Sequence, residues 1–280
     1  MYHIISPTGC LTNSYLLASG LGYPSSSLNQ CHSSYLRFCN DISGLDIQWF
    51  GRTAWLEQQK KIDTLLELFT STDKLTDLPA DCKTTSKDVR REVKNLLDNS
   101  MALMEKLDPT LAAIFNFFVH TIFFQRTANT NGGSTSSAPG VIWFAPRRDW
   151  TVQDGMEFLI HELTHTLIFI DERINGHYVS IDSIADPKNY ATSSILEKKR
   201  PLDKVVHSFI VSVEILLLRR RLGEPSSPKA HPPNETLLNC AITTSHDLRS
   251  SSLRMLMTEH LIYIIDKTIQ LLETNLKFVA

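Results

Sequence analysis

Apolar residues recur at intervals of three and four along most of the chain, which is the spacing of one face of an α-helix. The clearest case is the stretch from Ser86 to Leu107, where Val93, Leu97 and Met104 share one side. Other stretches have this pattern or are long apolar runs between polar breaks, and they cover residues 45–69, 108–124, 151–173, 202–222, 237–248 and 252–276. The pattern therefore predicts a mainly α-helical protein.

Two parts of the chain depart from this periodicity. Residues 1–41 are rich in Ser, Gly, Asn and Tyr without a sustained period, and Gly20–Ser27 predicts a loop. We expect residues 1–44 to be an N-terminal extension, which is either a lid or, as we favour, simply ordered. Residues 127–139 are largely Asn, Gly, Ser and Thr and predict a polar loop. The short apolar segment Gly140–Ala145 follows and ends before Pro146, which predicts one short β-strand at an edge of the structure.

We expect a single domain over residues 1–280, because no internal repeat and no convincing domain boundary interrupts the chain. Its core, about residues 108–222, holds the candidate chemistry, and C-terminal helices follow over residues 235–280. The longest apolar runs, 111–124 and 205–218, are too short to cross a bilayer and each contains a histidine or an acid. They predict core helices.

Charge and cysteine content narrow the class of protein. The net charge is −2, with 28 basic and 30 acidic residues, so no basic excess favours nucleic acid. The five cysteines are scattered and odd in number, without Cys-x-x-Cys spacing, which favours reduced thiols. The first residues lack the basic segment of a signal peptide. We expect a cytoplasmic protein that binds neither membrane nor nucleic acid.

The candidate chemistry centres on the pentapeptide His161-Glu162-Leu163-Thr164-His165. Two histidines four apart on a helix share one face, so both imidazoles can reach one metal ion, with Glu162 beside a water or substrate on that ion. The flanking residues are apolar, and burying an unpartnered histidine pair is costly unless a metal binds it. We expect a zincin-like HExxH helix in a helical core. The alternative is two hydrogen-bonded core histidines with a solvent-facing glutamate.

A catalytic metal also needs a third ligand, with one position left open. Asp171 has the spacing that one peptidase group uses, but Ile168 stands where that group needs a glycine turn. His177 is close in sequence and follows a glycine. His207 and Glu214 are seven apart and share one face of an apolar helix, so either is a candidate, and a buried Glu214 needs a partner in any case.

Three stretches, taken in order, resemble a known family. They are Gly133–Ser137 with Gly140–Trp143, then His161–His165, then Arg200-Pro201-Leu202 followed by His207 in an apolar helix. Their order is similar to that of the HExxH-motif family of peptide-modifying proteins found beside clusters for ribosomally made peptides in bacteria. That family is described as iron- and 2-oxoglutarate-dependent peptide β-hydroxylases. The similarity covers about residues 108–221.

The resemblance implies that His161 and His165 hold Fe(II), that His207 is a further ligand, and that Arg200 binds the 2-oxoglutarate carboxylate. It also implies a ribosomally made peptide as substrate. An acidic leader peptide is a candidate partner for Arg219-Arg220-Arg221, although a solvated helix end is the favoured interpretation of these arginines. Apart from the resemblance, an arginine at the start of a helix can hold a carboxylate by a bidentate hydrogen bond. The alternative for Arg200 is a surface arginine beside Lys198 and Lys199.

We favour an Fe(II)- and 2-oxoglutarate-dependent oxygenase that hydroxylates the β-carbon of a residue in a peptide. The alternative is a zinc metallopeptidase or amidase with Glu162 as the catalytic general base, in which Tyr178 or His177 stabilises the oxyanion. A third hypothesis is a binding module that retains the metal without turnover. The complete motif disfavours it, because a site without turnover would tend to lose one of the three motif residues.

Overall fold

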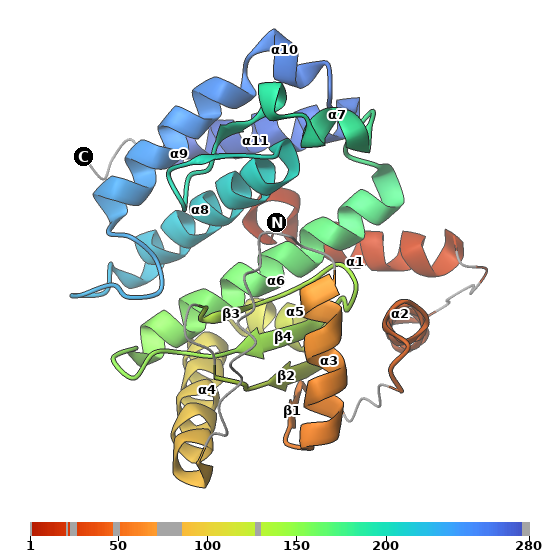
Figure 1. Ribbon diagram of the computed structural model, residues 1–280, viewed down its shortest axis with the longest axis vertical. Coiled ribbons are helices and arrows are strands. Elements are labelled where there is room, and N and C mark those ends of the chain that lie inside the picture. Colours follow the sequence, from red (N-terminus) through yellow and green to blue (C-terminus); the bar gives the residue numbers. More distant parts are fainter. Residues whose placement is uncertain are drawn as a thin grey trace. The chain divides into compact units, whose positions relative to one another are not determined.

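The computed structural model describes residues 2–20, 22, 27–46, 51–71, 86–126 and 130–275. The chain divides into two compact units, and the divisions fall within helices α1 (Tyr2–Gly20) and α6 (Val152–Asn175). We call Leu11–Ile170 the sheet unit, and Met1–Cys10 with Asp171–Ala280 the helical unit. The described residues form eleven α-helices and small sheets (Figure 1), which confirms a mainly α-helical protein. The single domain stays a prediction.

The sheet unit contains a four-stranded sheet in the order β1-β2-β4-β3. Its strands are β1 (Ala54–Leu56), β2 (Thr121–Phe123), β3 (Gly132–Gly133) and β4 (Val141–Phe144). Strands β1, β2 and β4 are parallel, with Ile122 opposite both Trp55 and Ile142, and β3 is antiparallel to β4. The strand predicted at 140–145 exists, but its edge position was wrong, because β4 pairs on both sides. An edge of the sheet belongs to β3, whose two glycines lack the apolar character that predicts a strand.

Helices cover both faces of this sheet. Successive side chains of a strand point to opposite faces, so Trp143 and Phe144 face different layers. On one face, Phe69 of α3 (Gln59–Ser71) packs with its ring centroid 6.1 Å from that of Trp143. On the other, the ring centroid of Phe158 in α6 lies 5.7 Å from that of Phe144. The N-terminal half of α6 therefore packs on a sheet, whereas the sequence predicted a helical core around it.

In the sheet unit, the starts of two helices agree with the sequence pattern, whereas the extents of two predicted helices differ from the structure. Helix α4 (Lys87–Leu107) begins after Ser86, and α5 (Pro109–Phe118) begins after Asp108, whose carboxylate accepts from the Leu111 amide. Both starts were predicted. The predicted helix 108–124 is too long, because its last residues pair with β1 and β4 as strand β2. The predicted helix 45–69 is likewise a strand, β1, followed by α3, and Trp49 lies outside the described residues.

The N-terminal extension expected over residues 1–44 contains helices α1 and α2 (Leu28–Ser43), which the sequence pattern did not predict. The loop predicted at Gly20–Ser27 falls largely outside the described residues. Ser27 caps the start of α2, and Gly44 ends it in a left-handed conformation. Its buried positions include Cys31, Tyr35 and Cys39. Cysteine and tyrosine do not form an obvious apolar stripe, so the sequence pattern missed a helix that packing stabilises.

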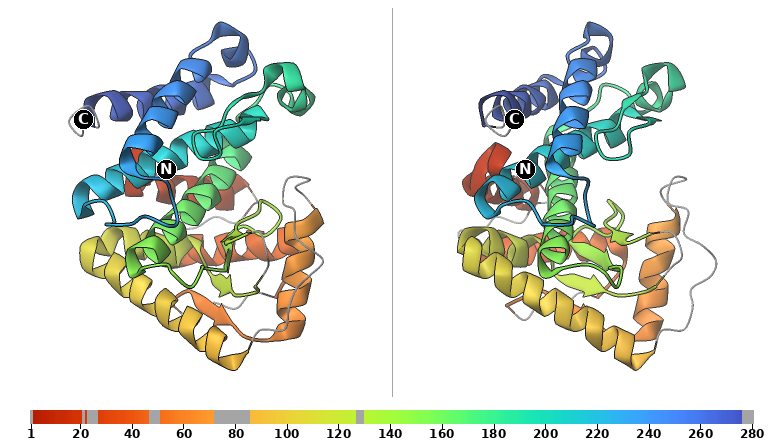
Figure 2. Two further views of the ribbon diagram at one scale, coloured as in Figure 1. Left: turned by 60° about the vertical axis from the view of Figure 1, so that its left-hand side comes forward. Right: turned by 90° about the vertical axis from the view of Figure 1, so that its left-hand side faces the viewer.

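The helical unit is built around α8 (Leu202–Leu222), which contacts α9 (Asn234–Leu248) and α11 (Glu259–Asn275) (Figure 2). Nearly every residue of α8 from Leu202 to Leu218 is buried, as predicted for a core helix. The predicted helix 252–276 is interrupted, because α10 (Ser251–Arg254) ends before Met257 pairs with Tyr178. The unit also holds α7 (Ile181–Ala185), a 3-10 turn (Pro187–Asn189), and strands β5 (Ala191–Thr192) and β6 (Lys199–Arg200), which pair antiparallel.

Among the described helices, none is both long enough and apolar enough to cross a bilayer.

Candidate metal centre

Helix α6 presents His161 and His165 on one face, one turn apart. Their Nε2 atoms lie 3.0 Å apart, so both nitrogens converge on the same point. Each imidazole also stacks against an aromatic ring of the same helix. Phe158 lies 6.3 Å from His161, and Phe169 lies 6.2 Å from His165, with both pairs close to parallel. These rings fix the orientation of the two imidazoles.

The glutamate of the motif is buried, in contrast to the solvent-facing alternative. Glu162 is 3% exposed, and its Oε2 accepts a hydrogen bond of 2.7 Å from the Ser134 hydroxyl. Burial raises the pKa of the Glu162 carboxyl to about 7, although the hydrogen bonds from Ser134 oppose this shift. Its Oε1 lies 3.8 Å from Nε2 of His161. Ser134 follows β3 in the loop 130–139, so this loop contributes to the surroundings of the motif.

The three motif residues fit a metal ion by the chemistry of their donors. One ligand atom from each of His161, Glu162 and His165 lies within 4.8 Å of the other two. Imidazole nitrogens are the usual ligands of zinc and non-haem iron, and nitrogens 3.0 Å apart can bind one ion at about 2.0–2.1 Å. Both histidines are partly exposed, whereas Glu162 is buried. An ion at this point would therefore retain access for a water or a substrate group.

The residues predicted as third ligand and cofactor anchor belong to the helical unit. His207 is buried on α8, and its pKa is lowered well below the ordinary value by burial and by nearby positive charge, including that of Lys204 and Arg200. Arg200 lies on β6 and is half-buried. His207 and Arg200 are thus electrostatic neighbours within this unit. Their assignments as metal ligand and 2-oxoglutarate anchor stay predictions.

Glu214, the alternative third ligand, has another partner. Its carboxylate accepts from the backbone N–H of His3 at 3.0 Å, and its Oε2 lies 2.5 Å from the His3 imidazole Nδ1. Both residues belong to the helical unit, and Glu214 is fully buried. The expectation that a buried Glu214 needs a partner is confirmed. This partner provides a structural role for the acid.

Asp171 and His177, considered as third ligands from their spacing, lie together in a different cluster. Oδ2 of Asp171 lies 2.7 Å from Nε2 of His177 and 2.8 Å from Nε2 of His260. No local pattern connects His260 with them, because it stands 89 residues after Asp171. Within the described residues this is a second group of three side chains with metal-ligand chemistry.

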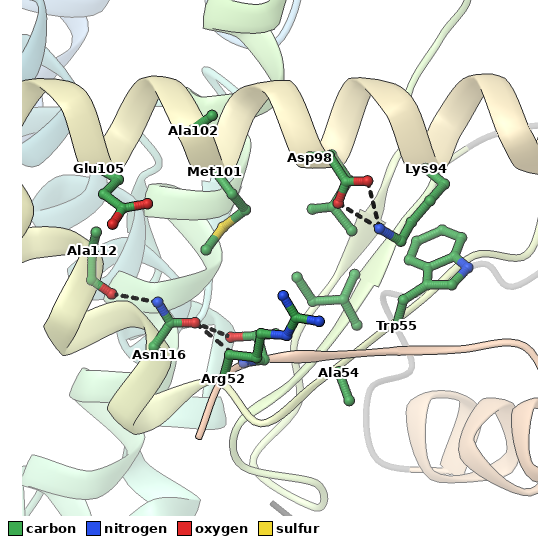
Figure 3. A pocket seen from close by; sticks show the side chains of 13 residues that line it. Arg52, Ala54, Trp55, Lys94, Asp98, Met101, Ala102, Glu105, Ala112 and Asn116 are labelled. Carbon is green, nitrogen blue, oxygen red and sulfur yellow. Dashed lines mark hydrogen bonds and ion pairs between the residues drawn. The ribbon is translucent and has the colours of Figure 1, made fainter. Parts of the chain in front are cut away.

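A pocket of about 880 Å³ in the sheet unit lies apart from the motif (Figure 3). Its walls come from α4, α5 and the strands β1 and β2. Four of its polar residues bind one another: Lys94 pairs with Asp98 at 2.5 Å, and Asn116 accepts from Thr53 at 3.0 Å. Arg52 and Glu105 also line the pocket. We do not assign a ligand to it.

Comparison of the chain with models of known protein families gives no match, and comparison with curated proteins gives none either.

Proposed function

We propose that this chain is an enzyme whose catalytic metal is held by His161 and His165, in a zincin-like arrangement with Glu162 beside the metal. The observation that carries this proposal is the convergence of the two Nε2 atoms, 3.0 Å apart, next to a buried carboxylate. The stacked rings of Phe158 and Phe169 hold the imidazoles in place. Such preorganisation is what a metal site needs. The same 3.0 Å separation also fits a hydrogen bond between the two imidazoles, and metal analysis separates the two cases.

We further propose that the reaction is an oxygenation: hydroxylation of the β-carbon of a peptide residue, with Fe(II) and 2-oxoglutarate as cofactors. When bound, iron with 2-oxoglutarate and oxygen supplies the oxidising chemistry. The support is the order of motifs along the chain. In this proposal Arg200 binds a carboxylate of 2-oxoglutarate through its guanidinium. Glu162, held by Ser134, orients groups at the metal.

A zinc peptidase or amidase is the second candidate, and the placement of Glu162 favours it. The carboxylate is held in one orientation by Ser134, and its other oxygen lies 3.8 Å from Nε2 of His161. A general base for a metal-bound water needs this position. In this reading Glu162 is the catalytic base, and Arg200 has no cofactor to bind.

The first experiment is metal analysis of protein purified without oxygen, combined with an assay of succinate release from 2-oxoglutarate. The oxygenase proposal expects succinate when Fe(II) and oxygen are added, and loss of this activity in His161→Ala. Tightly bound zinc without succinate release would instead support the peptidase. Protein that binds neither metal would overturn both.

Two variants then separate the oxygenase from the peptidase. Glu162→Gln keeps the two histidines, so the metal stays bound. A peptidase would lose its general base in this variant and would no longer hydrolyse its peptide substrate. Arg200→Ala should raise the 2-oxoglutarate concentration needed by about 10-fold or more, because a charge-assisted hydrogen bond contributes about 1.5–3 kcal/mol. Lys198→Ala, an exposed neighbour, is the control. An unchanged requirement in Arg200→Ala would remove this residue from the site.

A further inference from the structure

The helical unit contains a compact cluster formed by Asp171, His177 and His260. Asp171 and His177 are each 1% exposed, whereas the side chain of His260 is 36% exposed. Both histidine Nε2 atoms are directed at the same carboxylate oxygen, at 2.7 and 2.8 Å. The rings of the two histidines lie 6.2 Å apart at an angle of 26°. The cluster is therefore buried on two sides and open to solvent at His260.

Three separate segments bring these side chains together. Asp171 lies in the last turns of α6, and the helix ends at Asn175 because Gly176 adopts a left-handed conformation with φ of 64°. This turn reverses the chain, so that His177 returns to Asp171. The amide of Asn175 donates to Oδ1 of Asp171 at 3.2 Å, which leaves Oδ2 to the two histidines.

Backbone pairing fixes His260 beside them. The Thr258 N–H donates to the His177 carbonyl at 2.9 Å, and the Val179 N–H donates to the Leu256 carbonyl at 3.0 Å. The Thr258 hydroxyl donates to the Gly176 carbonyl at 2.9 Å. Helix α11 begins directly after Thr258, so His260 in its first turn is held next to His177. The backbone thus positions all three side chains in advance.

We propose that Asp171, His177 and His260 form a second site for a divalent transition-metal ion, separate from the His161–His165 centre. Two imidazoles and one carboxylate are the donor set that zinc and non-haem iron take. One ligand atom from each residue lies within 4.8 Å of the others. The carboxylate neutralises part of the ion's charge inside the protein, and the exposed side of His260 leaves room for water as a further ligand. The site does not depend on the proposed function.

The alternative is a network in which both imidazoles donate to a buried Asp171 carboxylate without any ion. Such a network also satisfies the acid, so hydrogen-bond geometry does not separate the two cases. A metal-binding measurement separates them. Once the His161–His165 centre has been removed, a metal site at Asp171 still takes up an ion, whereas a hydrogen-bonded network does not.

The test uses full-length protein carrying His161→Ala and His165→Ala, freed of metal by a chelator and checked for folding by circular dichroism. Cobalt(II) is then titrated, and its visible absorption and the bound amount after equilibrium dialysis are measured. We expect about one ion per chain, since one site of this kind takes one ion. Absence of bound cobalt in this folded variant would overturn the proposal, whatever the activity of the intact enzyme.

A third substitution locates the ion. Adding His260→Ala should weaken cobalt binding by more than about 100-fold. Loss of a group that only supports a ligand would weaken binding by about 10–100-fold. His260→Gln serves the same purpose if the alanine variant does not fold. The matched control is His246→Ala, an exposed histidine outside the cluster. Equal binding in the His260 and His246 variants would place the ion elsewhere and overturn the proposal.

Discussion

At the scale of single residues, Gly140 shows how closely the backbone of the sheet unit is packed. Its φ is 77°, and a Cβ atom there would lie 2.5 Å from the Phe118 carbonyl oxygen and 2.7 Å from the His120 ring. Only glycine fits this position without strain. The segment that leads into β4 can therefore approach the end of α5, and this approach aligns β2 with β4.

We predict that Gly140→Ala lowers the free energy of unfolding by about 3 kcal/mol or more, because a positive φ and a steric overlap add together. The control is Gly133→Ala, since a Cβ at Gly133 meets no heavy atom within 4 Å and its φ is not positive. Urea unfolding of both variants measures the difference. Similar stabilities would contradict the close packing described for Gly140.

His120 is a hydrogen-bonded core histidine that lies between the end of α5 and the start of β2. Its Nε2 donates to the Pro139 carbonyl at 3.0 Å, which leaves Nδ1 to accept from the Thr121 hydroxyl at 3.0 Å. Both bonds fit the neutral imidazole. Burial lowers the pKa of His120 to about 4, so the charged form is disfavoured in the folded protein.

We predict that His120 makes the protein less stable in acid. Because its folded pKa lies below the unfolded value of about 6.5, its contribution is complete above that value and is lost as the pH falls toward about 4. The expected loss is about 2 kcal/mol between about pH 7 and pH 5. His120→Gln should remove this part of the slope in urea unfolding across that range. An identical slope in the variant would contradict the buried neutral histidine.

At the scale of elements, the start of α6 determines where the HExxH motif lies along the helix. The Thr151 hydroxyl accepts from the Asp154 N–H at 3.1 Å, and the Asp154 carboxylate accepts from the Thr151 N–H at 2.9 Å. This reciprocal arrangement is a capping box, with Asp in the place of the usual Glu. The cap fixes the first turn, two turns before His161.

We predict that Thr151→Ala lowers the free energy of unfolding by about 1 kcal/mol, because the Asp154 N–H loses its acceptor. Thr151→Ser keeps the hydroxyl and should retain most of the stability. Thermal or urea unfolding of the two variants at one pH gives the comparison. Equal destabilisation by Ala and Ser would show that the Thr151 methyl group, and not the cap, matters there.

At the scale of the whole molecule, the two compact units share helices α1 and α6 along the chain. Helix α6 is continuous across the division, whereas α1 is kinked at Ser6, whose φ is 69°. A continuous helix that belongs to both units links their unfolding, because melting either end removes hydrogen bonds next to the other. We therefore predict one cooperative thermal transition, as the single-domain interpretation requires. Calorimetry tests this through equality of the calorimetric and van't Hoff enthalpies. Two separate transitions would contradict it.

Metal removal is the second prediction at this scale. An ion that binds only the folded protein contributes about 2.7 kcal/mol at 100 times its dissociation constant. For a chain of this length, that corresponds to a rise of roughly 5 °C in the thermal midpoint. We expect zinc to raise the midpoint of chelator-treated protein, with a smaller rise in His161→Ala and in His260→Ala. The His246→Ala variant should respond like the unchanged protein.

Several elements were predictable because local signals and packing agree there. Helix α4 has an amphipathic stripe and Ser86 as its cap, and α8 is a long apolar run that the structure buries. The pattern failed at β1 and β2, where helical spacing was overruled by pairing between strands far apart in sequence. It also failed at α1 and α2, whose buried faces use Cys, Ser and Tyr in place of an aliphatic stripe.

The sequence by itself determined the two histidines of the first centre, since a spacing of four within one helix places both on one face wherever that helix packs. Only the tertiary structure decided that Glu162 is buried against Ser134, because Ser134 comes from a loop 28 residues earlier. The same holds for Asp171, His177 and His260, of which the last is brought in by backbone pairing between distant segments. Local spacing fixes what one helix presents, whereas contacts between separate elements depend on how the whole chain packs.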